Sequence, residues 1–183
     1  MNKTRMKTTT TLLIAIFLIS AIASIAIPLA SAQPQEITIL VTQQQTRYYP
    51  DGNVMHTLKP HLTSKELRLT GNVLHGEWSY SPPVTNLEGE KYILVYNKES
   101  EKWILHEGTV EYTSPNIPNY HVVEYWEGSL TLNEDLQLVE GAFIQYGYSG
   151  DQAAKDRYPW AEWDEGKGMW LLAYSIYTYT PPA

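Results

Sequence analysis

Apolar and polar residues alternate along most of the chain after residue 32, in short runs separated by turn-forming residues. In the first of these runs the apolar residues Ile37, Ile39 and Val41 share one face, and Thr38 and Thr42 occupy the other. A period of two is typical of β-strands that bury one face and expose the other. The pattern therefore predicts a chain built almost entirely from strands.

Turn signals between the runs predict hairpins. The first is centred on Pro50-Asp51-Gly52, a sequence that favours a tight turn, between the runs 47–49 and 54–58. Three further pairs of runs are predicted to form neighbouring strands: 66–70 with 73–80, 91–97 with 102–113, and 120–132 with 136–148. A final strand, 169–178, closes the domain.

Successive strands without helices between them indicate an antiparallel meander. We expect an all-β fold of about eight strands closed as a barrel, with a β-sandwich as the alternative. Three glycines inside predicted strands, Gly108, Gly128 and Gly141, each follow a glutamate. Glycine within a strand permits the sharp coiling that a barrel wall needs, and this favours the barrel.

One short helix is predicted near residues 151–158. Ser149 and Gln152 have the spacing of a capping box, and Asp151 lies where the helix dipole favours an anion. Pro159 ends the helix after two turns. Because the helix lies between the last two long runs, we expect it to form a lid or plug on the barrel.

The N-terminus has the three parts of a secretory signal peptide. Lys3, Arg5 and Lys7 precede twenty uncharged residues, 11–30, and Ala30-Ser31-Ala32 supplies a cleavage site. We therefore predict a signal peptide at 1–32 and a single all-β domain at 33–183, with the mature chain beginning at Gln33. An uncleaved membrane anchor is the alternative. Both place the domain outside the cytoplasm, in the extracellular space or the cell envelope.

Composition narrows the partners of this domain. Without the three basic residues of the signal, ten lysines and arginines face 20 acidic residues, a net charge of −10. Such a domain is repelled by phosphate backbones, so nucleic acid is not expected as a partner. The chain has no cysteine, which excludes a disulfide framework, and no metal-binding or cofactor-binding motif is present. All six tryptophans and all fourteen tyrosines fall after residue 32. Because each combines an apolar ring with a polar group, they suit partly solvated surfaces and small-molecule pockets.

Strand phasing gives the most specific candidate site. Glu124 shares the apolar face of its run with Trp126, and the same phasing puts His106, Glu140 and Tyr146 on the inward faces of neighbouring runs. Buried ionisable groups must be paired, hydrogen-bonded or neutral. Antiparallel pairing about residues 116–117 would bring position 106 opposite about 127, which is within a diagonal step or two of 124. We therefore expect His106 to be the partner of Glu124.

A second candidate lies in the segment 160–168, which carries Trp160, Trp163 and three acidic residues. Exposed tryptophans can stack on sugar rings while carboxylates accept the sugar hydroxyls. The alternative is that this pair packs over the barrel mouth. The acidic spacing matches no calcium loop, so no metal site is predicted.

These features favour a secreted, non-catalytic binding module for a small amphipathic molecule or a glycan. A structural or surface-assembly protein of the cell envelope is the second reading, because the run 169–178 is apolar on both faces and is therefore either central or involved in self-association. A glycoside hydrolase or barrel isomerase is the third, although no catalytic motif supports it.

Overall fold

The computed structural model describes residues 33–78, 91–114 and 120–182. The predicted signal peptide at 1–32 lies outside the described residues, as do positions 79–80 of the second predicted hairpin and the loop 115–119. Among the described residues, no helix is both long enough and apolar enough to cross a membrane.

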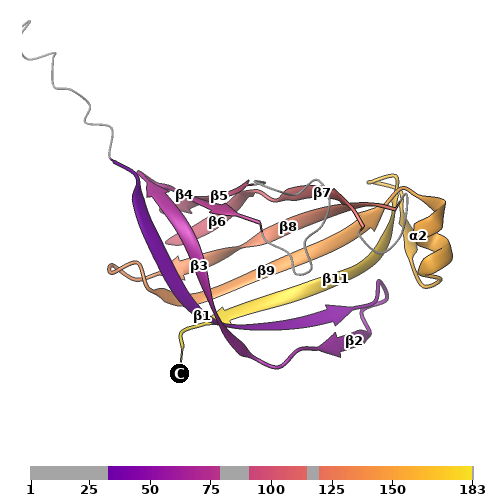
Figure 1. The fold of residues 1–183 in the computed structure, drawn as a ribbon, viewed down its shortest axis with the longest axis horizontal. Helices are drawn as coiled ribbons and strands as arrows, with labels where there is room; N and C mark the ends of the chain where they lie inside the picture. The colour runs from indigo at the N-terminus through magenta and orange to yellow at the C-terminus, as the bar shows by residue number, and fades with distance from the viewer. Residues whose placement is uncertain (1–32, 79–90, 115–119, 183) are drawn as a thin grey trace, which may run out of the picture. The chain divides into compact units, whose positions relative to one another are not determined.

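The domain is a closed antiparallel β-barrel of eight strands with one short helix, as predicted from the sequence (Figure 1). The sandwich alternative is therefore wrong. In chain order the elements are β1 (Gln35–Tyr48), β2 (Val54–Thr57), β3 (His61–Thr70), β4 (Val73–Glu77), β5 (Lys91–Asn97), β6 (Lys102–Glu107), β7 (Thr109–Thr113), β8 (His121–Leu132), β9 (Leu138–Ser149), α2 (Gln152–Arg157), β10 (Glu162–Asp164) and β11 (Met169–Thr180).

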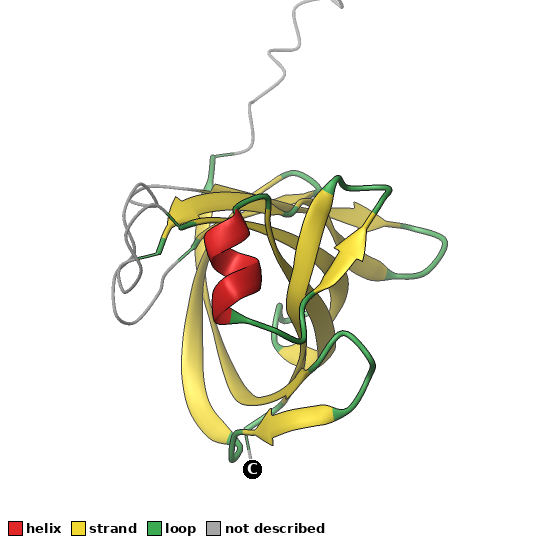
Figure 2. Ribbon diagram, turned by 90° about the vertical axis from the view of Figure 1, so that its right-hand side faces the viewer, coloured by secondary structure: helices red, strands yellow, loops and turns green. Residues whose placement is uncertain are grey.

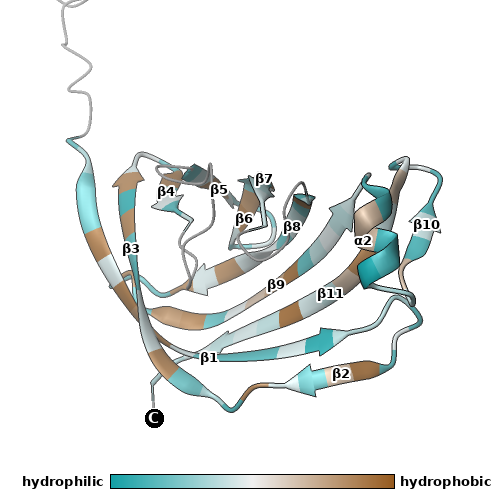
Figure 3. Cartoon of the chain, turned by 45° about the vertical axis from the view of Figure 1, so that its right-hand side comes forward, coloured by the Kyte–Doolittle hydropathy of each residue, from teal (hydrophilic) through white to brown (hydrophobic). Residues whose placement is uncertain are grey.

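The barrel closes because the first and last strands pair with each other. Neighbouring strands run in the order β11-β9-β8-β6-β5-β4-β3-β1, and β1 then pairs with β11 in a register that places Gln45 opposite Tyr177. Strand β7 continues the line of β6 along β8, whereas β2 and β10 add hairpin arms to β1 and β11. In Figure 3 apolar and polar residues alternate along β1 and β3, as a wall with one buried face requires.

Glycine allows the wall to bend sharply where β6 passes into β7. A Cβ atom on Gly108 would lie 2.2 Å from the carbonyl oxygen of Trp126, so only glycine fits this close approach. The backbone bond from Trp126 N to Gly108 O, 2.6 Å long, forms at the same place. Gly128, on β8, has a φ of +149°, which side-chain-bearing residues rarely adopt. The predicted use of these two glycines as bending points agrees with this geometry.

The helix predicted near 151–158 is present as α2, and it lies across one end of the barrel (Figure 2). Ala154 is fully buried there in a small cluster with Tyr120, Val122, Ala161 and Leu172. The predicted capping box is wrong, because Asp151 is the N-cap and its side chain makes no capping bond. Its Oδ2 atom instead accepts a hydrogen bond from the backbone N–H of His121, at 2.7 Å, and so ties the helix to the start of β8.

The doubly apolar run 169–178 is central in the sheet. Strand β11 is hydrogen-bonded to β9 on one side and to β1 and β10 on the other. Its inward residues join the interior of the barrel, and the buried Leu172 packs beneath α2. The fold of one chain thus accounts for the apolar pattern from which self-association was inferred.

Candidate functional site

Glu124 is the central group of a buried polar cluster in the barrel. Its side chain is only 3% exposed and lies on the inward face beside Trp126, as predicted. The hydroxyl of Tyr112 donates a hydrogen bond to Oε1 at 2.8 Å, and the indole Nε1 of Trp126 donates one to Oε2 at 3.0 Å. Two donors to one buried carboxylate offset much of the cost of removing it from water.

Arg47 belongs to the same interior region. It continues the inward face of β1, and its positive charge reaches Tyr112 and Tyr177, where it lowers the phenol pKa against the larger opposing effect of burial. Its Nε atom is buried without a hydrogen-bond partner among the residues that the structure describes. This region of the interior therefore holds an acidic and a basic side chain in a mainly aromatic environment.

Hydrogen bonds extend this cluster along the wall towards the middle of the barrel. Gln45 Nε2 donates to Ser175 Oγ at 3.2 Å and to the hydroxyl of Tyr177 at 3.0 Å. That hydroxyl donates in turn to Oε1 of Gln145, at 3.1 Å. Since Tyr177 and Trp126 also line the adjoining pocket, these bonds fix the orientation of part of its wall.

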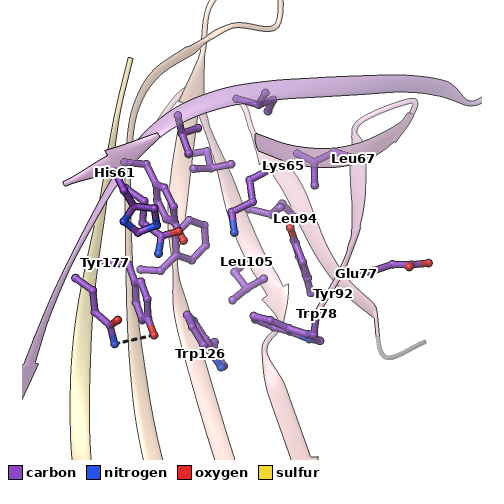
Figure 4. Close-up of a pocket in the computed structure, with 17 residues that line it drawn as sticks. His61, Lys65, Leu67, Glu77, Trp78, Tyr92, Leu94, Leu105, Trp126 and Tyr177 are labelled. Atoms are coloured by element: carbon purple, nitrogen blue, oxygen red, sulfur yellow. Dashed lines mark hydrogen bonds between the residues drawn. The ribbon is translucent and has the colours of Figure 1, made fainter. Parts of the chain in front are cut away.

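A pocket of about 450 Å³ occupies the barrel interior next to this cluster (Figure 4). Its surface is mostly apolar, with polar groups at a few points. The apolar and aromatic lining residues are Ile39, Val41, Leu67, Trp78, Tyr92, Leu94, Leu105, Trp126, Leu130, Phe143, Tyr177 and Tyr179. Its polar lining residues are Gln43, Gln45, His61, Lys65 and Glu77.

Four aromatic rings form a continuous wall in the pocket. Ring centroids are 4.7 Å apart for Trp78 and Tyr92, 4.9 Å for Trp78 and Trp126, and 5.1 Å for Trp126 and Tyr177. Gly76 makes room for this wall, because a Cβ atom there would lie 2.2 Å from the ring of Tyr92. Stacked and tilted rings at these separations present a broad, rigid, apolar surface.

Among the described residues that line the pocket, Lys65 is the one lysine or arginine. It points inward from β3 towards the aromatic residues in Figure 4, whereas Glu77 points away from them. Its Nζ atom lies 5.8 Å from the ring centroid of Tyr179. Burial lowers the pKa of Lys65, because the ammonium is partly removed from water.

Strands β3 and β4 diverge beside Lys65. They pair from Arg68↔His75 to Thr70↔Val73, and among the described residues the first part of β3 pairs with β1 but with no strand on the β4 side. A second hollow of about 430 Å³ lies against this divergence. It shares Lys65, Leu67, Glu77 and Tyr92 with the main pocket, which therefore approaches the surface between β3 and β4.

The structure does not bring the other predicted residues of this site to Glu124. His106 is exposed, because it is the extra residue of a bulge: Ile93 pairs with Glu107 and Leu94 pairs with Leu105, which leaves 106 between them. The pairing of 102–113 with 120–132 is as predicted, but the residue opposite Glu124 is Val110. The expected Glu124–His106 pair is therefore wrong.

A second bulge turns Glu140 outward. Leu132 pairs with Leu138 and Thr131 with Glu140, so Val139 is the extra residue and the phase of β9 reverses. Glu140 is exposed and lies 3.3 Å from the Lys102 ammonium. Tyr146, six residues further along β9, also faces outward, and its hydroxyl donates to Oε1 of Glu127 at 3.3 Å.

Trp160 and Trp163 lie on the outer surface, 41% and 48% exposed. The indole Nε1 of Trp160 donates to the carbonyl of Leu172 at 3.0 Å, and its ring meets Tyr49 edge-on. Trp163 packs edge-on against Trp170, with centroids 5.0 Å apart. These two indoles are thus held by neighbours outside the barrel, away from the interior pocket.

The described ranges 33–78, 91–114 and 120–182 contain no cluster of three or more histidine, aspartate or glutamate side chains that could hold a metal ion. The architecture and the pocket define the protein as a closed β-barrel with an internal, aromatic-lined chamber.

Comparison of the chain with protein-family models, with curated proteins and with solved structures found no match.

Proposed function

We propose that the protein is a binding module that takes a small amphipathic molecule into the barrel. The observation that carries the proposal is the pocket of about 450 Å³ in the barrel interior, lined mainly by aliphatic and aromatic side chains with polar groups at a few points. Small-molecule sites are usually concave, mostly apolar and roughly 300–1,000 Å³ in volume. A few convergent polar groups then fix the orientation of the ligand.

The polar cluster supports the same proposal. Glu124 holds the Trp126 indole through Nε1, and Gln45 holds the Tyr177 hydroxyl. These bonds keep the aromatic wall in one arrangement before a ligand enters. A preformed wall reduces the entropy lost on binding.

A glycan bound on the outer tryptophans has less support. Trp160 is engaged by Tyr49 and Tyr158 in edge-on contacts, and Trp163 by Trp170 in another. Sugar stacking needs an open ring face beside hydrogen-bond acceptors. We therefore favour the interior pocket over the outer segment 160–168. With the predicted export signal, binding would take place in the extracellular space or the cell envelope.

Filling the pocket with a larger side chain should weaken binding. We expect Leu105→Trp to weaken the affinity for the uncharged fluorescent probe N-phenyl-1-naphthylamine by at least about tenfold, since the larger ring would occupy the ligand volume. Ile104→Trp is the matched control, because Ile104 is the adjacent residue, is 40% exposed and does not line the pocket. Its affinity should stay within about twofold of the wild type.

Fluorescence titration of the purified protein and both variants measures these affinities, and circular dichroism checks that each variant is folded. Equal binding by Leu105→Trp and Ile104→Trp would contradict the proposal. So would the absence of probe binding by the wild-type protein.

A further inference from the structure

The charged side chains of the pocket are unequally placed. His61 and Glu77 are exposed, and Glu77 lies 3.9 Å from the exposed ammonium of Lys91. Lys65 is half-buried on the inward face of β3, where its parity is that of the buried Leu67. The positive charge of Lys65 therefore faces the apolar chamber.

No carboxylate within the described residues lies at ion-pair distance from Lys65. The neighbouring acid on β3, Glu66, faces the other way and accepts a hydrogen bond from Thr38 Oγ1 at 2.7 Å. A partly desolvated cation without a counter-charge is costly to the folded protein, and an anion brought by a ligand would offset that cost. The same loss of hydration lowers the pKa of Lys65, because burial disfavours its charged form.

From this placement we infer that the pocket binds an amphipathic organic acid, whose anionic group pairs with the Lys65 ammonium while its apolar body packs on the wall of Trp78, Tyr92, Trp126 and Tyr177. This inference rests on the proposed function and names the ligand class. An aromatic chamber also suits organic cations. Here, however, the Lys65 ammonium would repel a second positive charge, so the acid is the better fit.

Two naphthalene probes of similar shape separate charge from shape. 8-Anilinonaphthalene-1-sulfonate carries a permanent anion, and N-phenyl-1-naphthylamine is its uncharged counterpart. In Lys65→Met, which keeps the apolar length of the side chain but removes the charge, we expect sulfonate affinity to fall by at least about tenfold. The affinity for the uncharged probe should change by no more than about twofold.

Matched variants complete the design. Lys65→Arg keeps the charge and should retain most of the sulfonate affinity. Lys91→Met removes an exposed cation outside the pocket and should leave both affinities unchanged. Displacement of either probe by dodecanoate, with dodecan-1-ol as the uncharged comparison, extends the test to a carboxylate.

The stability of the variants separates a ligand-binding lysine from a structural one. Because the folded state disfavours the buried ammonium, Lys65→Met should leave the denaturation midpoint unchanged or raise it. If Lys65→Met does not fold, Lys65→Gln serves in its place.

The outcomes distinguish the two proposals. Loss of sulfonate binding alone supports the acid. Equal loss of both probes, or loss of neither, overturns it while the pocket remains a binding site. Failure of the wild type to bind the uncharged probe overturns the proposed function itself.

Discussion

Replacing Glu124 with alanine is expected to destabilise the protein by about 3–5 kcal/mol, the largest effect that we predict for a single substitution. The variant leaves the Tyr112 hydroxyl and the Trp126 indole without the buried carboxylate to which they donate. It also leaves the charge of Arg47 in the interior without the acid whose field opposes it at Tyr112 and Tyr177. Denaturant melts followed by circular dichroism measure the change.

Two further variants make this prediction specific. Glu124→Gln keeps the shape but sets an amide NH₂ against a donor, and we expect a loss of about 1–3 kcal/mol. His106→Ala alters the exposed bulge residue and should change stability by less than about 0.5 kcal/mol. A loss below about 0.5 kcal/mol for Glu124→Ala would show that the buried cluster does not stabilise the fold.

Alkaline pH is expected to unfold the protein cooperatively between about pH 10 and 12. Burial raises the pKa of Tyr92 and of Tyr177 to about 12. The pKa values of further tyrosines are also raised, again mainly by burial: Tyr112, Tyr120, Tyr148 and Tyr179. In the unfolded chain a tyrosine ionises near its ordinary pKa of about 10.

The sign of the pH effect on stability follows from the number of protons that the folded and unfolded states bind. Below about pH 10 the buried tyrosines are protonated in both states, so their contribution to stability is fully present. Between about pH 10 and 12 the unfolded chain loses these protons and the folded protein keeps them, so unfolding becomes more favourable. Tyr92 and Tyr177 alone remove about 2–3 kcal/mol each by pH 12, a large part of the roughly 5–15 kcal/mol typical of a domain.

Ultraviolet absorbance of tyrosinate and circular dichroism, recorded on the same pH series, test this expectation. The buried tyrosines should ionise together with the loss of secondary structure. Ionisation of all fourteen tyrosines in one step near pH 10, with the fold intact, would be the contradictory result.

The barrel could be predicted from the sequence because its determinants are local. Alternation within runs, the Pro50-Asp51-Gly52 turn and glycines at bending points are properties of neighbouring residues. The turn forms as expected, with Gly52 at a φ of +86° and the Asp51 side chain accepting a hydrogen bond from the N–H of Asn53. The same phasing placed Glu124 correctly, because β8 continues through 124 and 126 without interruption.

The errors in the predicted site have a common cause. A single extra residue at His106, and another at Val139, reverses the phase of the strand that follows. Glu140 and Tyr146 follow the inserted Val139, so alternation assigns them the wrong face, and His106 is itself the inserted residue. Nothing in the alternation itself marks where such a residue is inserted.

Lys65 was missed although the sequence carries a signal for it. The predicted run begins at residue 66, one position after Lys65. Within β3 (His61–Thr70), Lys65 shares the parity of Leu67 and Leu69, the same kind of pattern that singled out Glu124. The sequence alone does not show which strands face one another across the barrel. The pocket joins β3 to β5, β8 and β11, and only barrel closure brings Lys65 towards Tyr92, Trp126 and Tyr179.

A crystal structure of the protein with N-phenyl-1-naphthylamine would show directly whether the barrel interior binds a small molecule. We expect the probe inside the barrel, in contact with Trp78, Trp126 and Leu105. A probe bound only on the outer surface at Trp160 or Trp163, with none in the interior, would contradict it.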